Sequence, residues 1–280
     1  MPVRYDEPVA RPVVQQAAGQ FANVPFADIS ARHGLAWETD GMQTTLAVDG
    51  LANARDLGGL ERNNGSLTPV GVFVRAEMLD RLGASGWDAL RIHGVRTIID
   101  LRRPDESTGK APDDMLVRRV DLDGDEREFW TPLEEDGRWG TPLYYTAHLN
   151  ELPHRLAQVL HAIATAPEGA VLFHCGAGWD RTGLVAAVLL KAFGVTEDAA
   201  ADDYLASFAN ADAMQVLHRR SFDVEERLAV LDRFGHSADS AFRTMYRQLD
   251  LDEWFRLADL DADTERTILT WRGQVDALQD

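Results

Sequence analysis

Cysteine is nearly absent from this chain, because Cys175 is the only one among 280 residues. A single cysteine excludes an intrachain disulfide, so the chain fits a reducing compartment. A thiol in such a chain is either a small buried apolar group or a reactive one. The residues around Cys175 therefore decide what it does.

Lysine is also scarce. The chain has two lysines, Lys110 and Lys191, against 26 arginines and 46 acidic residues, and its formal net charge is −18. A field of that sign repels nucleic acid and anionic bilayers, and no polybasic run offers a local exception. An anionic ligand must then bind in a local positive region, for which we consider Arg55, Arg75, Arg102, Arg103 and Arg181.

Long apolar runs are missing as well. No segment approaches membrane-spanning length, and residues 1–8 contain no basic region followed by an apolar core. We therefore expect a soluble, cytoplasmic protein, with secretion by a signal-independent route left open. The 45% content of hydrophobic residues is enough for one large domain with a substantial core.

Cys175 follows an apolar run, Val171–His174, and precedes a loop with Gly176 and Gly178 that leads into a second apolar run. Arg181 comes six residues after the cysteine. A strand, a tight loop and a helix N-terminus in this order bring backbone N–H groups and a guanidinium to one anion. The same surroundings favour the thiolate, which is the nucleophilic form of cysteine. The pattern predicts phosphoryl transfer through a thiophosphate intermediate.

The positions of this loop have separate predicted roles. Gly176 and Gly178 supply positive φ, so that successive amides converge. Arg181 binds two phosphate oxygens through its planar fork, which a lysine lacks. Thr182 donates its hydroxyl to the Cys175 sulfur. The predicted phosphate-binding residues are Gly176, Ala177, Gly178, Trp179, Asp180, Arg181, Arg55 and Arg102.

Residues 174–183 read His-Cys-x-x-Gly-x-Asp-Arg-Thr-Gly, which resembles the signature of the cysteine-dependent protein tyrosine phosphatases. Asn53–Gly59 resembles the Asn-x-Arg-Asp-Leu-Gly-Gly stretch of a bacterial and fungal group whose active-site loop carries an Asp-Arg pair. Asp100–Arg102 and Asp203–Ser207 resemble two further segments of that group, Asp-Leu-Arg and Asp-Tyr-Leu-x-Ser. The resemblance covers roughly residues 45–210 and implies a cysteine-phosphatase-like central sheet flanked by helices.

Trp179 departs from that resemblance. Many members that act on phosphoinositides as well as phosphotyrosine have a lysine immediately before the Asp-Arg pair. An indole instead offers an apolar face suited to an aromatic ring. We therefore expect a preference for phosphotyrosine or other aryl phosphates over phosphoinositides.

The patterning predicts an α/β fold in a single domain, residues 1–280. Within it we expect a partly ordered extension over 1–40, a catalytic core over 45–210 and a helical tail or lid over 211–280. The expected strands lie near 43–48 and at 72–75, 95–99, 116–120 and 171–174.

Helices are expected in four places. One begins at Ser85 with Asp88 in a capping box, and another starts after Thr196 and is followed by helices almost to the end. Apolar spacing predicts the other two at 149–163 and 184–190. The acidic segment 121–142 is expected to be a loop that forms a wall or lid beside the site.

A leaving phenolate needs a proton donor. If strands 95–99 and 171–174 are parallel neighbours, Asp100 and Cys175 both emerge at the carboxyl edge of the sheet, where α/β folds place ligands. With the family resemblance added, Asp100 is the first choice for the general acid. Asp180, inside the loop, is the second choice, and the third is the set Asp121, Asp123 and Asp125.

The remaining histidines show no i, i+4 pair, so no metal site is predicted, and the mechanism needs no cofactor. His174 is expected to make a buried hydrogen bond that orients the loop. The predicted ligands are a phosphorylated protein or small phosphoester and inorganic phosphate, with no nucleic acid and no membrane insertion. Two alternatives remain open: a phosphoinositide or small-molecule phosphatase with the same nucleophile, and a phosphate-binding pseudoenzyme.

Overall fold

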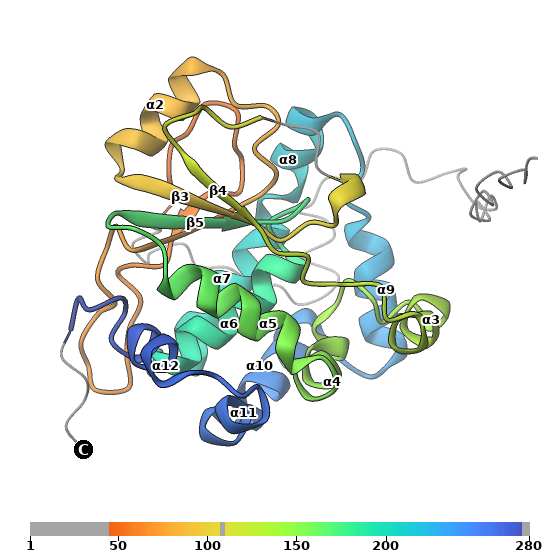
Figure 1. Ribbon diagram of the computed structural model, residues 1–280. Helices are drawn as coiled ribbons and strands as arrows, with labels where there is room; N and C mark the ends of the chain where they lie inside the picture. The colour runs from red at the N-terminus through yellow and green to blue at the C-terminus, as the bar shows by residue number, and fades with distance from the viewer. Residues whose placement is uncertain (1–44, 107–109, 276–280) are drawn as a thin grey trace, which may run out of the picture. The chain divides into compact units, whose positions relative to one another are not determined.

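A five-stranded sheet is central to the computed structural model, which describes residues 45–106 and 110–275 (Figure 1). In spatial order the strands are β1 (Arg55–Asp56), β2 (Phe73–Ala76), β5 (Ala170–His174), β3 (Val95–Asp100) and β4 (Leu116–Arg119). β1 runs antiparallel to β2, and the other neighbouring strands are parallel. The parallel pairing on which the choice of Asp100 depended is present, because β3 lies directly beside β5 with Asp100 opposite His174.

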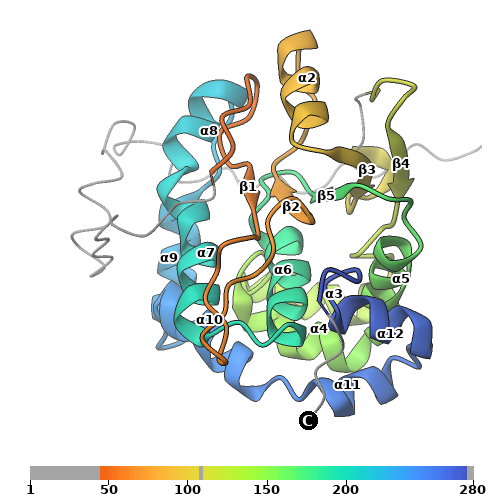
Figure 2. The same cartoon turned by 90° about the vertical axis from the view of Figure 1, so that its left-hand side faces the viewer.

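Helices cover both faces of this sheet, as predicted (Figures 1 and 2). α2 (Ala84–Ile92) lies on one face, and α5 (Pro153–Ala164) and α6 (Asp180–Ala192) lie on the other. α12 (Ala262–Leu269) packs against α5 and α6. The other helices are α3 (Arg127–Asp136), α4 (Tyr145–Glu151), α7 (Glu197–Ala209), α8 (Ala211–His218), α9 (Val224–Arg233), α10 (Ala238–Gln248) and α11 (Leu251–Leu257), with short 3-10 turns η1 (Pro104–Glu106) and η2 (Pro142–Tyr144).

Four of the five predicted strands are confirmed to within one residue at each end. The strand expected near 43–48 is wrong, because Thr45 makes one isolated bridge to Arg55 and residues 43–44 lie outside the described ranges. β1 was missed. It consists of one buried Arg-Asp pair, so it carries no apolar alternation that would predict a strand.

The predicted capping box at the start of α2 is wrong. Gly83 precedes the helix without a side-chain cap, and the Ser85 hydroxyl donates to Asp49 at 2.7 Å instead. Asp88 forms an ion pair with Arg91. At the start of α7 the expectation is confirmed, since the Thr196 hydroxyl accepts a hydrogen bond from the Ala199 N–H at 3.2 Å.

Tertiary packing changes two other predictions. Segment 121–142 is not all loop, because α3 forms in it around Pro132 and buries Trp130 and Leu133. The Trp130 indole donates to the Asp123 carbonyl at 2.7 Å, which ties α3 to the chain before it. The helix expected over 149–163 is divided into α4 and α5 at Pro153, which lacks an N–H and fits the first turn of α5.

The predicted extension, residues 1–40, lies outside the described residues. The helical course after Thr196 is confirmed through α12. None of the helices in ranges 45–106 and 110–275 is long and apolar enough to span a membrane.

Candidate active site

Cys175 lies at the carboxyl edge of the sheet, directly after β5 and five residues before α6 begins. It is 2% exposed. In the described part of the chain, the backbone N–H groups of residues 176–181 donate no hydrogen bond. Unpaired amides that lead into a helix N-terminus bind anions, and the helix dipole adds to the attraction. The loop therefore has the composition of an oxyanion cradle around a thiol.

Gly178 adopts the predicted positive φ, at +63°, whereas Gly176 does not, so that half of the expectation is wrong. A Cβ at Gly178 would collide with the backbone of Ala76 and Glu77. A Cβ at Gly176 would meet nothing within 4 Å. The loop thus packs against the end of β2 at Gly178, and there it requires glycine for both space and conformation.

A buried ion-pair network holds the loop from behind. Asp203 of α7 accepts from Arg55 at 2.9 Å and also forms an ion pair with Arg75. Arg75 donates on to the Gly178 carbonyl at 3.0 Å, and the Asn53 amide donates to the Ala177 carbonyl at 3.0 Å. Burial opposes ionisation of Asp203, but its two arginine partners prevail and lower its pKa.

This network brings together the Asn53–Gly59 and Asp203–Ser207 segments, and it corrects the expectation for Arg55. The Arg55 guanidinium is 3% exposed and donates to Asp203, Asn53 and Ser207. With its donors engaged there, Arg55 supports the loop instead of binding phosphate directly.

Arg181, at the start of α6, pairs with two carboxylates that the loop itself does not supply. Its Nη1 and Nη2 donate to the two carboxylate oxygens of Glu106 at 2.9 and 2.8 Å. Nη1 also lies 3.2 Å from Asp123. Burial opposes its charge, but these carboxylates raise the pKa of Arg181, so the arginine stays cationic.

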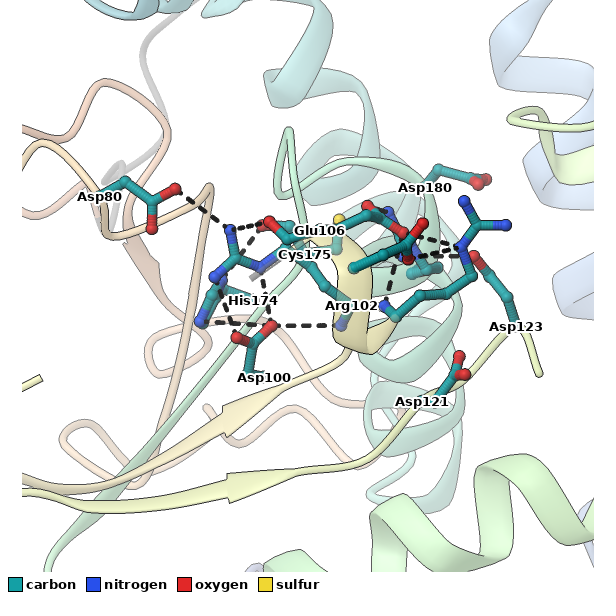
Figure 3. A network of polar contacts seen from close by, with 12 residues as sticks. Asp80, Asp100, Arg102, Glu106, Asp121, Asp123, His174, Cys175 and Asp180 are labelled. Atoms are coloured by element: carbon teal, nitrogen blue, oxygen red, sulfur yellow. Dashed lines mark hydrogen bonds and ion pairs between the residues drawn. The ribbon is translucent and has the colours of Figure 1, made fainter. Parts of the chain in front are cut away.

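Glu106 was missed by the sequence analysis. It belongs to η1, a Pro-Asp-Glu turn a few residues after β3, and one acid among 46 carries no distinguishing pattern. The turn after β3 brings its carboxylate to Arg181. Figure 3 shows Glu106 and Cys175 in the same network of polar side chains.

Asp100 does emerge at the predicted edge, but it is engaged by a cation. Arg102 donates to both Asp100 carboxylate oxygens at 2.9 Å, and to Asp80 at 3.3 Å. Burial raises the pKa of Asp100, but the bonds from Arg102 outweigh it and the net pKa is lowered. This placement opposes the prediction that Asp100 is the general acid, because an ionised Asp100 is a poor proton donor. It also opposes the prediction that Arg102 binds phosphate, because Arg102 already binds carboxylates.

His174 makes a buried contact on the loop. Its Nδ1 donates to the Cys175 carbonyl at 3.1 Å, and its Nε2 lies 3.8 Å from Asp100. Burial lowers the pKa of His174 and favours the neutral ring. The imidazole therefore links the base of the loop to the Asp100–Arg102 pair.

Two other carboxyl groups, those of Asp180 and Asp123, have pKa values that are raised, whereas the pKa of Asp100 is lowered. Burial raises the pKa of Asp180 to about 6 and that of Asp123 to about 6, against the effect of Arg181 on each. Asp180 accepts from the Tyr144 hydroxyl at 3.1 Å, and its second oxygen has no hydrogen-bond partner among the described residues. Both acids thus hold protons at higher pH than an ordinary aspartate does.

Asp121 and Asp125, the other two members of the predicted set of three, are less suited to proton transfer. Asp121 accepts from the Gly124 N–H at 2.9 Å, and the side chain of Asp125 is fully exposed.

Trp179 and Thr182 differ from their predicted roles. The Trp179 indole is 1% exposed and packs edge-on against Phe208, with ring centroids 4.1 Å apart. It therefore cannot stack on a substrate ring. The Thr182 hydroxyl is buried with no hydrogen-bond partner among the described residues, so the expected bond to the Cys175 sulfur is not formed. No group of three or more potential metal ligands occurs in ranges 45–106 and 110–275.

Comparison with known proteins decides the family. Residues 46–262 match the tyrosine phosphatase family, which is more than half of the chain. The chain belongs to this family. Membership confirms the predicted resemblance to the tyrosine phosphatases, and it makes the chain a relative of phosphoric monoester hydrolases.

Two curated relatives show how far the likeness extends. A tyrosine-protein phosphatase of Nostoc commune is 36% identical over 146 residues, which are 50% of this chain and 49% of the relative. Triple specificity protein phosphatase PtpB of Mycobacterium tuberculosis is 31% identical over 188 residues, 56% of this chain and 67% of PtpB. The chain thus spans about half the length of the Nostoc phosphatase.

Among solved structures, P. aeruginosa TpbA in complex with pTyr is similar at a TM-score of 0.32 and 21% identity. The match covers 57% of this chain and 85% of TpbA.

Proposed function

We propose that this tyrosine phosphatase family member hydrolyses phosphate monoesters with Cys175 as the nucleophile. The observation that carries the proposal is that Cys175 is followed by six backbone N–H groups that donate no hydrogen bond within ranges 45–106 and 110–275, with Arg181 at the helix start. Sγ attacks phosphorus, the bond from phosphorus to the ester oxygen breaks, and the leaving oxygen takes a proton. Water then attacks the thiophosphate, and inorganic phosphate and the thiolate are released.

Asp180 is the general acid in this proposal. It immediately precedes Arg181 in the loop, and burial keeps its pKa near 6, so a useful fraction is protonated close to neutral pH. After the first step, the same carboxylate takes the proton from the attacking water. Asp123 has a similar pKa, but its carboxylate lies 3.2 Å from Nη1 of Arg181 and is therefore bound to the arginine that this proposal assigns to the phosphate.

Phosphotyrosine and other aryl phosphates are the proposed substrates. Family membership supports this class, and a net charge of −18 disfavours approach to an anionic membrane. The alternative is hydrolysis of phosphoinositides or small molecules at the same site. The name of the relative PtpB, a triple specificity protein phosphatase, supports more than one class of substrate. Since Trp179 is buried, the selectivity does not come from an indole that stacks on the substrate.

The experiment that tests this function compares kcat/KM for a phosphotyrosine peptide, a soluble phosphoinositide and an aryl phosphate, using wild type and Cys175→Ser. We expect turnover by the wild type with the aryl and peptide substrates preferred, and a loss of several orders of magnitude in the variant. Binding without turnover by the wild type would identify a pseudoenzyme. A preference for the phosphoinositide would move the proposal to the alternative class.

A further inference from the structure

Arg227 of α9 reaches across to the loop region from a distant part of the chain. It donates through Nη1 to the Gly140 carbonyl, in the turn after α3. Its guanidinium carbon lies 5.3 Å from the ring centroid of Trp179 and 5.7 Å from that of Trp139. The cation is therefore held against indoles of two different segments. One of them, Trp179, is the residue immediately before Asp180.

Several charged or titratable groups surround Asp180 on the elements packed against it. Arg181 follows it on α6, and Arg227 approaches from α9. The remaining groups are Tyr144 and Tyr145 from the η2–α4 segment, Tyr204 from α7 and Asp123 from the acidic segment. Two cations thus act on one carboxyl group.

These two cations differ in how much of their charge is already compensated. Arg181 is paired with Glu106 and Asp123. Arg227 forms no ion pair within the described residues, and its buried Nε has no hydrogen-bond partner there. An uncompensated charge near a buried carboxyl group favours the ionised form of that group. In agreement, burial raises the pKa of Asp180 most strongly, and the positive charge of Arg227 opposes this and lowers it.

We propose that Arg227 is a positioning residue for the general acid: from α9 its guanidinium packs on the Trp179 ring and holds a positive charge beside the Trp179–Asp180 turn. This charge then acts on the proton release of Asp180. This inference rests on the proposed role of Asp180. It gives α9 a function beyond packing, because the pKa of Asp180 then depends on the position of this helix. A displacement of α9 by a few ångströms would weaken the effect, since the interaction falls with distance.

The test uses three variants of the full chain. Arg227→Met removes the charge and keeps an unbranched side chain, whereas Arg227→Lys keeps the charge. Arg233→Met is a matched control. Arg233 lies on the same helix and, like Arg227, donates to a backbone carbonyl near the end of α3, that of Asp136. It also packs against an aromatic ring, that of Phe234. The readout is the pH profile of kcat/KM for an aryl phosphate with a poor leaving group.

We expect Arg227→Met to move the alkaline limb upward by ~1 pH unit, because loss of the cation raises the pKa of the acid. Arg227→Lys should restore the wild-type limb, and Arg233→Met should leave it in place. A limb that stays fixed in Arg227→Met, or that moves equally in Arg233→Met, overturns the inference.

Asp180→Asn separates this failure from failure of the proposed function. If the asparagine variant loses the limb while Arg227→Met does not move it, Asp180 is the acid and Arg227 does not tune it. If Asp180→Asn keeps the limb, the assignment of the acid itself is wrong, and the inference falls with it. Thermal unfolding of each variant shows whether a change in activity follows from a change in stability.

Discussion

Arg181 and Glu106 form a fork-to-fork ion pair, in which the two terminal nitrogens of the arginine donate to the two carboxylate oxygens at 2.9 and 2.8 Å. Such a bidentate pair fixes the guanidinium plane. It also places a negative charge beside the position where the proposed function puts a phosphate dianion. Glu106 therefore has two opposed effects, since it orients Arg181 and repels the ligand.

Substitution Glu106→Gln should lower the inhibition constant of inorganic phosphate about fivefold, roughly 1 kcal/mol, because the amide keeps the size of the side chain without its charge. Asp105→Asn is the control, since Asp105 lies in the same turn with 74% of its side chain exposed and pairs with Arg103. Weaker inhibition in the glutamine variant would mean that orientation of Arg181 outweighs charge repulsion.

The two glycines of the loop should respond differently to alanine. Gly178→Ala should lose activity and at least ~2 kcal/mol of stability, because the position has positive φ and its Cβ would collide with the end of β2. Gly176→Ala should fold normally, because its Cβ meets open space. Chemical unfolding measures both free energies. Equal losses in the two variants would contradict this geometry of the loop.

Asp203 should contribute strongly to stability. Asp203→Asn breaks a buried network while Arg55 and Arg75 stay buried, so we expect a loss of about 3–5 kcal/mol. Asp202→Asn, at the exposed neighbouring position, should have little effect. The folded-state pKa of Asp203 lies below its usual value, so its stabilisation is present above that usual value and is lost as the pH falls through the folded-state pKa. Unfolding curves at acidic pH should therefore converge for wild type and Asp203→Asn.

The general acid can be identified from leaving-group dependence. Asp180→Asn should slow esters with poor leaving groups far more than activated ones and remove the alkaline limb that begins near pH 6. Asp123→Asn and Asp100→Asn should keep that limb. If Asp123→Asn removes it instead, the acid belongs to the acidic segment and not to the loop.

The sequence predicted the parts of the site that are contiguous in the chain. Cys175, the glycines and Arg181 lie within seven residues, and a strand and a helix on either side fix their relation. The side chains that complete the site come from separate elements, so their directions depend on packing. Trp179 packs against Phe208, and Arg102 donates to Asp100, although the sequence alone was compatible with either side chain facing a ligand.

The same limit applies to the fold. β2, β3 and β5 were predictable because strands buried in a parallel sheet are short and mostly apolar. β4 is only partly buried, and Leu116 and Val117 alone carried its prediction. β1 and α3 were not, since β1 depends on the partners of Arg55 and α3 forms around a proline because Trp130 and Leu133 are buried beneath it.

Detection of the covalent intermediate tests the central claim most directly. The wild type and Cys175→Ser are mixed with an aryl phosphate, quenched in acid within the first turnover, digested and analysed by mass spectrometry. The account predicts a phosphorylated peptide that contains Cys175 in the wild type, formed as fast as the phenol is released, and none in the serine variant. Phenol release without a phosphorylated Cys175, or a phosphoryl group on another residue, would contradict it.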